Sequence, residues 1–167
     1  MKPDALFWLV IAGVALLMAI RCAVAGELPD VPGALNPAVT QHNIGKTVCV
    51  SGWTKTVRPA ASVTDRIKRR LLANVADRNA SHYELDHLVS LQLGGAPADP
   101  NNLWLEPYAG PCGARVKDVL EIALKRRVCA GTLTLAQAQA AIRANWVNAY
   151  NLYVGRLECG GDGYGPS

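Results

Sequence analysis

The sequence of 167 residues predicts an α+β fold in which a β-hairpin is accompanied by helices. Two short segments with β-favouring residues, 83–88 and 103–105, flank a loop that contains Gly94-Gly95, which is the pattern of a hairpin. Apolar residues then recur at helical spacing over 114–128, and a capping box at 134–137 opens a second helix. The net charge of +4 permits contact with nucleic acid without demanding it.

Residues 1–25 have the features of a secretory signal peptide. An unbroken apolar run over 5–20 follows Lys2, and Ala23-Val24-Ala25 is a small-x-small cleavage signal. The run is shorter than the ~20 residues of a membrane-spanning helix. We therefore expect an exported protein, periplasmic or secreted, with no stable membrane association after cleavage. An uncleaved membrane anchor is the alternative.

The rest of the chain has the length of one compact domain. Residues 26–46 mix proline, glycine and asparagine with few large apolar residues, so we expect an extended lead-in. Residues 47–155 contain the regular elements, and residues 156–167 form a flexible, glycine-rich tail.

The domain is expected to begin with a strand and a short helix. The segment 47–57 is rich in valine, which favours an additional N-terminal strand that ends at Arg58-Pro59. Thr64 is the expected N-cap of a helix that runs through Leu72. Basic side chains on this helix would contact phosphate groups independently of sequence, although an ordinary solvated helix face is the alternative. The substrate-binding candidates are Arg66, Lys68, Arg69 and Arg70.

Two helices are expected to close the domain as an antiparallel pair. The first covers 114–128 and is stopped by Gly131, and the second opens at Thr134 after a short turn. The apolar residues of the second helix fall on one face, which we expect to be buried: Leu135, Ala138, Ile142, Trp146, Ala149 and Tyr153.

Four cysteines remain after the signal peptide, which carries Cys22, is removed. An even set in an exported protein favours two disulfides over free thiols. A helix between Cys112 and Cys129 would hold them on the order of 20 Å or more apart, whereas a disulfide tolerates about 6 Å. Two pairings are left: Cys49 with Cys129 and Cys112 with Cys159, which we prefer, or Cys49 with Cys112 and Cys129 with Cys159. A four-cysteine zinc site is the competitor, but it lacks the usual Cys-x-x-Cys pairs.

The most informative residues lie on the predicted hairpin. Asp86 and His87 are adjacent in its first strand, and Asn101-Asn102-Leu103-Trp104 follows the Gly94-Gly95 loop. A carboxylate is a hard ligand for magnesium or manganese, and a neutral imidazole can deprotonate water. Adjacent residues of an extended chain point to opposite faces, so the two side chains can serve metal and water separately. This trio of carboxylate, imidazole and amide suggests metal-assisted phosphodiester hydrolysis.

These motifs resemble the ββα-metal core of HNH endonucleases, in particular small exported bacterial proteins of that kind, over roughly residues 47–154. The resemblance implies a hairpin-plus-helix core to which the N-terminal strand and the C-terminal helix pair are added. It also implies that Asp86 binds a divalent metal and that His87 is the general base. Asn102 would fix the hairpin and so orient His87, with Asn101 able to exchange roles with it.

One departure from the family pattern lies on the helix after the hairpin. The family has a histidine or asparagine there, but residues 113–118 contain neither, and Arg115 falls in that position. A guanidinium has no lone pair for a metal, so Arg115 is expected to hold the scissile phosphate, together with Lys117. Glu84 and Glu106 are expected to be exposed charges or salt-bridge partners, and the alternative is that these nearby carboxylates supplement the metal shell.

The sequence thus predicts an exported metal-dependent nuclease of HNH-like type that hydrolyses DNA, or RNA, with low sequence specificity. The expected cofactor is Mg²⁺, with Mn²⁺ or Zn²⁺ as alternatives. The missing third ligand favours an alternative: a catalytically inactive exported scaffold that binds nucleic acid, a protein partner or the cell envelope. The placement of Asp86, His87 and Arg115 separates the two, since catalysis as predicted needs them in one cleft.

Overall fold

The structure, a computed structural model, describes residues 28–157 and Cys159. The predicted signal peptide at 1–25 therefore lies outside the described residues, as does most of the predicted tail. Within the described part of the chain, no helix combines the length and apolar character that a bilayer-spanning helix needs.

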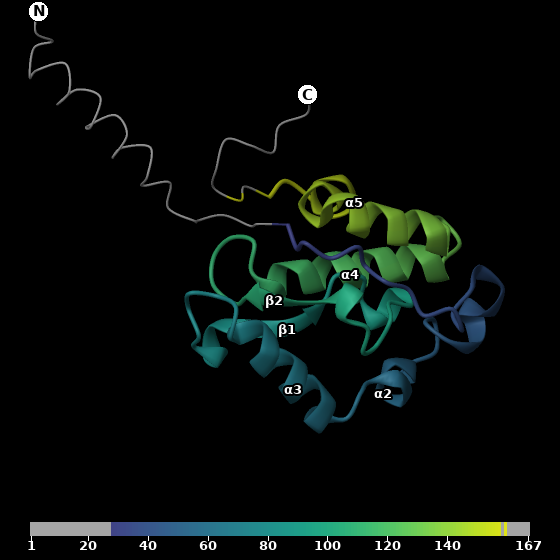
Figure 1. Ribbon diagram of the computed structural model, residues 1–167. Coiled ribbons are helices and arrows are strands. Elements are labelled where there is room, and N and C mark those ends of the chain that lie inside the picture. The colour runs from purple at the N-terminus through teal and green to yellow at the C-terminus, as the bar shows by residue number, and fades with distance from the viewer. Residues whose placement is uncertain (1–27, 158, 160–167) are drawn as a thin grey trace, which may run out of the picture.

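The elements form layers, with a small sheet between two sets of helices (Figure 1). Helix α5 (Leu135–Tyr153) lies against α4 (Ala114–Cys129), and α4 covers one face of the sheet. The sheet consists of β1 (Tyr83–His87) and β2 (Leu103–Pro107), and α3 (Ala61–Leu72) lies on its other face. The predicted α+β class and the antiparallel helix pair are confirmed.

The register of the hairpin decides which side chains face which helix. The strands are antiparallel, with Leu85 opposite Leu105, Asp86 opposite Trp104 and His87 opposite Leu103. Side chains alternate between the two faces of a strand. Leu85 and His87 line a pocket with residues of α3, whereas Asp86 contacts α4. The adjacent Asp86 and His87 therefore point to opposite faces of the sheet.

The predicted strand over 47–57 is wrong. This segment forms turns and then the short helix α2 (Trp53–Val57), which begins after Gly52 at a φ of 77°. Within the described residues the sheet contains β1 and β2 alone, and this segment pairs with neither strand. Val48 instead packs its apolar side chain into the core between the helices. Strand propensity reflects packing on a half-buried sheet and has no effect where that surface is missing.

The two neighbouring segments also differ from prediction. The lead-in contains a 3₁₀ helix, η1 (Gln41–Lys46), and forms a β-bridge between Leu35 and Gly95. Helix α3 begins at Ala61, directly after the extended Pro59-Ala60, and not after Thr64. The Thr64 hydroxyl instead donates a hydrogen bond to the Ala61 carbonyl within the first turn.

The core lies mainly between α4 and α5. Leu120, Leu124 and Val128 of α4 pack with the predicted apolar face of α5, which is buried except for the partly exposed Tyr153. The capping box is also confirmed, because the Thr134 hydroxyl accepts a hydrogen bond from the Gln137 N–H at 3.1 Å.

Two disulfides hold the ends of α4. Cys49 is bonded to Cys129 and Cys112 to Cys159, with Cα–Cα distances of 5.6 and 5.5 Å. The preferred pairing is confirmed. Disulfides form and persist in oxidising compartments, so these bonds are consistent with export.

Candidate functional site

His87 is the last residue of β1, and one of its ring nitrogens forms a hydrogen bond with a backbone carbonyl. Its Nε2 lies 2.9 Å from the Pro97 carbonyl oxygen, which can only accept a hydrogen bond, so Nε2 carries the proton. The other nitrogen, Nδ1, then keeps its lone pair. The side chain is 7% exposed, and this burial lowers the pKa of His87 below its ordinary value. His87 is therefore a neutral imidazole near pH 7, with Nδ1 able to accept a proton.

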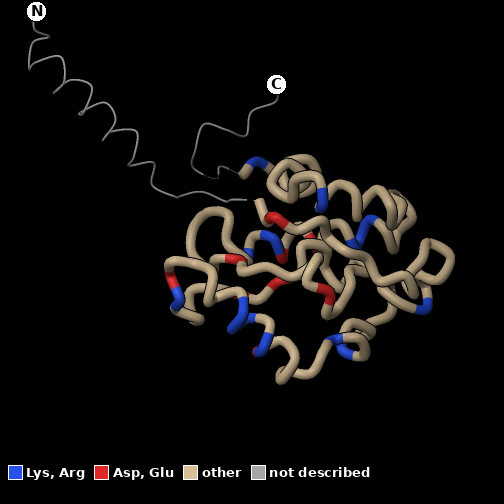
Figure 2. The backbone as a smooth tube through the Cα atoms, in the orientation of Figure 1, with Lys and Arg blue, Asp and Glu red and all other residues tan. Residues whose placement is uncertain are grey.

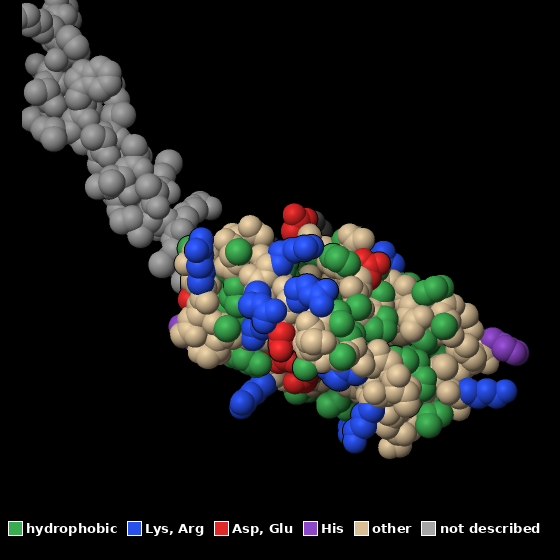
Figure 3. Space-filling model, turned by 60° about the horizontal axis from the view of Figure 1, so that its bottom comes forward, with side chains coloured by type: hydrophobic (Ala, Val, Ile, Leu, Met, Phe, Trp, Pro, Cys, Tyr) green, Lys and Arg blue, Asp and Glu red, His purple; other side chains and the backbone are tan. Residues whose placement is uncertain are grey.

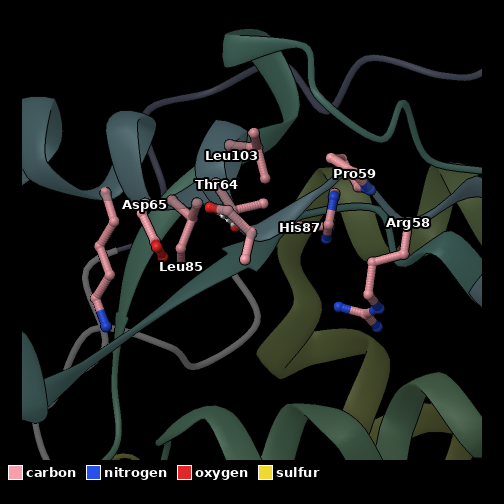
Figure 4. A pocket seen from close by; sticks show the side chains of 9 residues that line it. Arg58, Pro59, Thr64, Asp65, Leu85, His87 and Leu103 are labelled. Carbon is pink, nitrogen blue, oxygen red and sulfur yellow. Dashed lines mark hydrogen bonds between the residues drawn. The ribbon is translucent and has the colours of Figure 1, made fainter.

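A pocket of about 400 Å³ opens beside His87, between the sheet and α3 (Figure 4). The pocket is lined by Arg58, Pro59, Ala61, Thr64, Asp65, Lys68, Leu85, His87 and Leu103. Figure 4 shows the His87 ring next to Pro59 and the Arg58 side chain, with Asp65 on the far side of Leu85. Two cationic side chains, Arg58 and Lys68, thus share one pocket with a neutral imidazole.

The predicted substrate-binding residues divide into two groups. Lys68 lines the pocket, where its ammonium donates a hydrogen bond of 2.6 Å to the Tyr83 carbonyl. Arg66, Arg69 and Arg70 are exposed on α3 and do not line it. Basic positions follow α3 in Figure 2, and Figure 3 shows Lys and Arg side chains, mixed with acidic ones, on this side of the molecule. The α3 surface can therefore lead a phosphate chain towards the pocket.

Asn102 fixes the loop that contains Pro97, whose carbonyl oxygen accepts the hydrogen bond from His87. The Asn102 side chain is 0% exposed and donates hydrogen bonds of 3.0 Å to the carbonyls of Val89 and Ala96, while its Oδ1 accepts from the Val89 N–H at 2.8 Å. Gly95 permits this closure, because a Cβ there would lie 1.7 Å from the Val89 oxygen. Asn102 thereby sets the position of the loop that presents the Pro97 carbonyl to His87. Asn101 is exposed and makes none of these side-chain bonds.

Asp86 faces a buried lysine on the other side of the sheet. Its Oδ2 lies 2.5 Å from Nζ of Lys117, which also lies 2.6 Å from Oε1 of Glu121. The same ammonium donates a hydrogen bond of 2.8 Å to the His87 carbonyl. Lys117 is 1% exposed. The expectation that it engages a phosphate is wrong for this conformation, because its charge is enclosed and paired.

A second carboxyl lies in the same buried region. Glu106 is 0% exposed, so the expectation that it is a surface charge is wrong. Its oxygens receive no hydrogen bond, which suits a protonated acid and not a carboxylate. Burial raises the pKa of Glu106 to about 10. Burial likewise raises the pKa of Glu121 to about 7.

Asp86 and Lys117 stay charged within this cluster. Burial alone would raise the pKa of Asp86, but the Lys117 ammonium keeps it below its ordinary value. Burial alone would lower the pKa of Lys117, but Asp86, Glu121 and Glu106 raise it. At pH 7 the cluster therefore contains the Lys117 cation, the Asp86 carboxylate and a neutral Glu106, with Glu121 as a further acceptor for the ammonium.

Replacing Glu106 with glutamine should flatten the pH dependence of stability between pH 7 and 9. The folded chain keeps the Glu106 proton that the unfolded chain releases near pH 4.5, so the wild-type free energy of unfolding falls as pH rises, by up to about 1.4 kcal/mol per unit. The stability that the charge of Asp86 contributes is lost only below pH 7, and the stability that the charge of Lys117 contributes is lost only above pH 9. Urea denaturation at several pH values measures the slope, and Glu121→Gln should alter it chiefly below pH 7. A wild-type slope of zero from pH 7 to 9 would contradict a neutral Glu106.

The predicted metal site is not assembled as expected. Among the described residues, no group of three or more His, Cys, Asp or Glu side chains is arranged to hold a metal ion. The oxygens around Asp86 are of the kind that magnesium prefers, but the Lys117 ammonium already occupies the position between them. Arg115 is exposed on α4 and does not line the His87 pocket. Asp86, His87 and Arg115 therefore do not meet in one cleft, and the residues as folded do not fit a divalent ion at Asp86.

Arg58 belongs to the basic stretch between Lys46 and Arg78 that the sequence indicates as a phosphate-contacting surface, but no local signal places it beside His87. Sequence reasoning missed the burial of Lys117. Lys117 did carry a signal, because it lies three and seven residues before Leu120 and Leu124, which places it on the apolar stripe of α4. Glu121, four residues later, is its natural partner on that stripe.

Comparisons with protein-family models, with curated proteins and with solved structures give no match, so a function for this chain has to be argued from the site itself.

Proposed function

We propose that the protein is an exported hydrolase that cleaves the phosphodiester backbone of nucleic acid with little sequence preference. The observation that carries this proposal is His87, a neutral imidazole whose Nδ1 lone pair is free of the Pro97 bond, in one pocket with Arg58 and Lys68. Arg58 lies next to the His87 ring, and a base that shares a pocket with cationic side chains suits hydrolysis of an anionic ester.

In this proposal His87 acts as the general base. Its Nδ1 takes a proton from water, the water oxygen bonds to phosphorus, and the bond from phosphorus to the leaving sugar oxygen breaks. The leaving oxygen takes a proton from solvent. Arg58, which lies next to the His87 ring, stabilises the negative charge that develops on the phosphate, and Lys68 contacts the substrate farther along the pocket. Arg66, Arg69 and Arg70 hold the flanking phosphates, which carry no sequence information.

A cleavage assay on the mature, disulfide-bonded protein tests the proposal. Supercoiled plasmid and labelled single-stranded RNA are incubated with Mg²⁺, Mn²⁺, Zn²⁺ or a chelator. We expect His87→Ala to lower the rate by about 10²-fold or more. His42→Ala changes an exposed histidine on η1 and should leave the rate unchanged. Equal rates for wild type and His87→Ala would assign the cleavage to a contaminant, and no cleavage under any condition would remove the hydrolase proposal.

A second candidate is a catalytically inactive exported scaffold that binds nucleic acid. The specific observation in its favour is the Asp86–Lys117 ion pair, because it engages the residue that was expected to bind the metal. The exposed arginines of α3 would then supply the affinity. Binding of a fluorescent oligonucleotide should weaken steeply with salt and should weaken further in Arg66→Gln/Arg69→Gln. Arg126→Gln, which removes an exposed charge from α4, is the matched control.

A further inference from the structure

The Lys117 ammonium is completely satisfied by oxygen atoms. Its three N–H groups have three acceptors, which come from Asp86 on β1, Glu121 on α4 and the backbone carbonyl of His87. The side chain is buried, so water does not compete for these bonds. Burying an ammonium without partners costs much free energy of desolvation, and the three hydrogen bonds offset this cost for Lys117.

These acceptors form the kind of set that binds a hard metal cation. Magnesium and calcium take carboxylate and backbone carbonyl oxygens as ligands, supplied here by two different elements of the fold. We propose that Lys117 is a built-in cation that replaces the divalent ion, so that the chain binds no divalent ion at Asp86. Any action on nucleic acid then needs no divalent ion at Asp86, and this last part rests on the proposed function.

The fold keeps the ammonium in this position. Lys117 lies in the first turns of α4, and the disulfide from Cys112 to Cys159 anchors the chain just before that helix. Lys117 could leave Asp86 by a shift of the start of α4, but the disulfide between Cys112 and Cys159 opposes such a shift. A divalent ion entering beside Asp86 would also lie next to the ammonium and be repelled by it. Entry of an ion therefore requires Lys117 to leave a fully bonded site.

The first test uses the wild-type protein with both disulfides formed. Titration of Mn²⁺, followed by electron paramagnetic resonance and by calorimetry, should show no binding site tighter than the millimolar range. Mn²⁺ should also leave the amide resonances of Asp86 and His87 without paramagnetic broadening. Stoichiometric binding of Mn²⁺ that disappears in Asp86→Asn would overturn the inference.

The second test removes the internal cation. Lys117→Ala leaves a space that faces Asp86 and Glu121, so we expect Mn²⁺ to bind at least tenfold more tightly than to wild type. Lys117→Met is the matched control, because it fills the space without a charge and should gain no such affinity. Adding Asp86→Asn to Lys117→Ala should abolish the gain. A folded Lys117→Ala protein, verified by circular dichroism, that gains no affinity for Mn²⁺ would contradict the inference.

The outcomes separate this inference from the proposed hydrolase. Cleavage that persists in chelator and depends on His87 supports both. Absence of cleavage together with absence of Mn²⁺ binding rejects the hydrolase and supports the internal cation. Cleavage that requires Mn²⁺ bound at Asp86 supports the hydrolase and rejects the internal cation.

Discussion

Replacing Lys117 with methionine should lower the free energy of unfolding by about 3–5 kcal/mol at pH 7. Asp86 and Glu121 share this ammonium, at 2.5 and 2.6 Å, and both would remain buried without a cation. Methionine has a similar length, so the loss would come from the missing charge and hydrogen bonds and not from a cavity. Urea denaturation under oxidising conditions measures the change.

Two further variants identify the cause of this loss. Lys125→Met changes a less buried lysine of the same helix and should cost no more than about 0.5 kcal/mol. Adding Asp86→Asn and Glu121→Gln to Lys117→Met removes the uncompensated carboxylates and should recover part of the stability. If Lys117→Met is no more destabilising than Lys125→Met, the buried ion pairs do not stabilise this fold.

Removing the disulfide between Cys49 and Cys129 by a double replacement with alanine should cost about 4 kcal/mol. The two cysteines are 80 residues apart in sequence, so the bond eliminates a large loop-closure entropy from the unfolded chain. It also ties the turns around Cys49 to the end of α4, and no β-pairing holds those turns in place.

The second disulfide provides the comparison for this prediction. Cys112 and Cys159 are 47 residues apart, so their replacement should cost slightly less if loop entropy dominates. Urea denaturation of both double variants, beside reduced wild type, measures the difference. Equal midpoints for oxidised and reduced wild type would show that neither bond contributes to stability.

Local signals predicted those parts of the fold that are formed by local interactions. The capping box at Thr134 depends on residues within one helical turn, and the hairpin depends on short segments joined by a loop that needs Gly95. The segment 47–57 failed because strand formation depends on a partner elsewhere in the chain. Its valines are compatible with a strand, but in the described part of the chain the sheet contains β1 and β2 alone, and this segment pairs with neither.

The sequence indicated the local roles of Asp86, His87 and Asn102 on the hairpin but not the residues that they meet from other elements. Alternation along β1 correctly separates Asp86 from His87, and Asn102 makes the loop bonds that its position suggested. Which charges lie opposite Asp86 depends on how α4 docks on the sheet, and this contact joins residues 31 positions apart in sequence. Single residues indicate their chemistry, whereas the pairing of a buried charge depends on tertiary packing.

Helix α4 is pinned covalently at both ends, since Cys112 comes just before it and Cys129 is its last residue. A newly made chain whose thiols are still reduced has neither of these covalent links. Maturation of the protein is thereby linked to the redox state of its surroundings, because only oxidation ties the two ends of α4 to the turns around Cys49 and to Cys159.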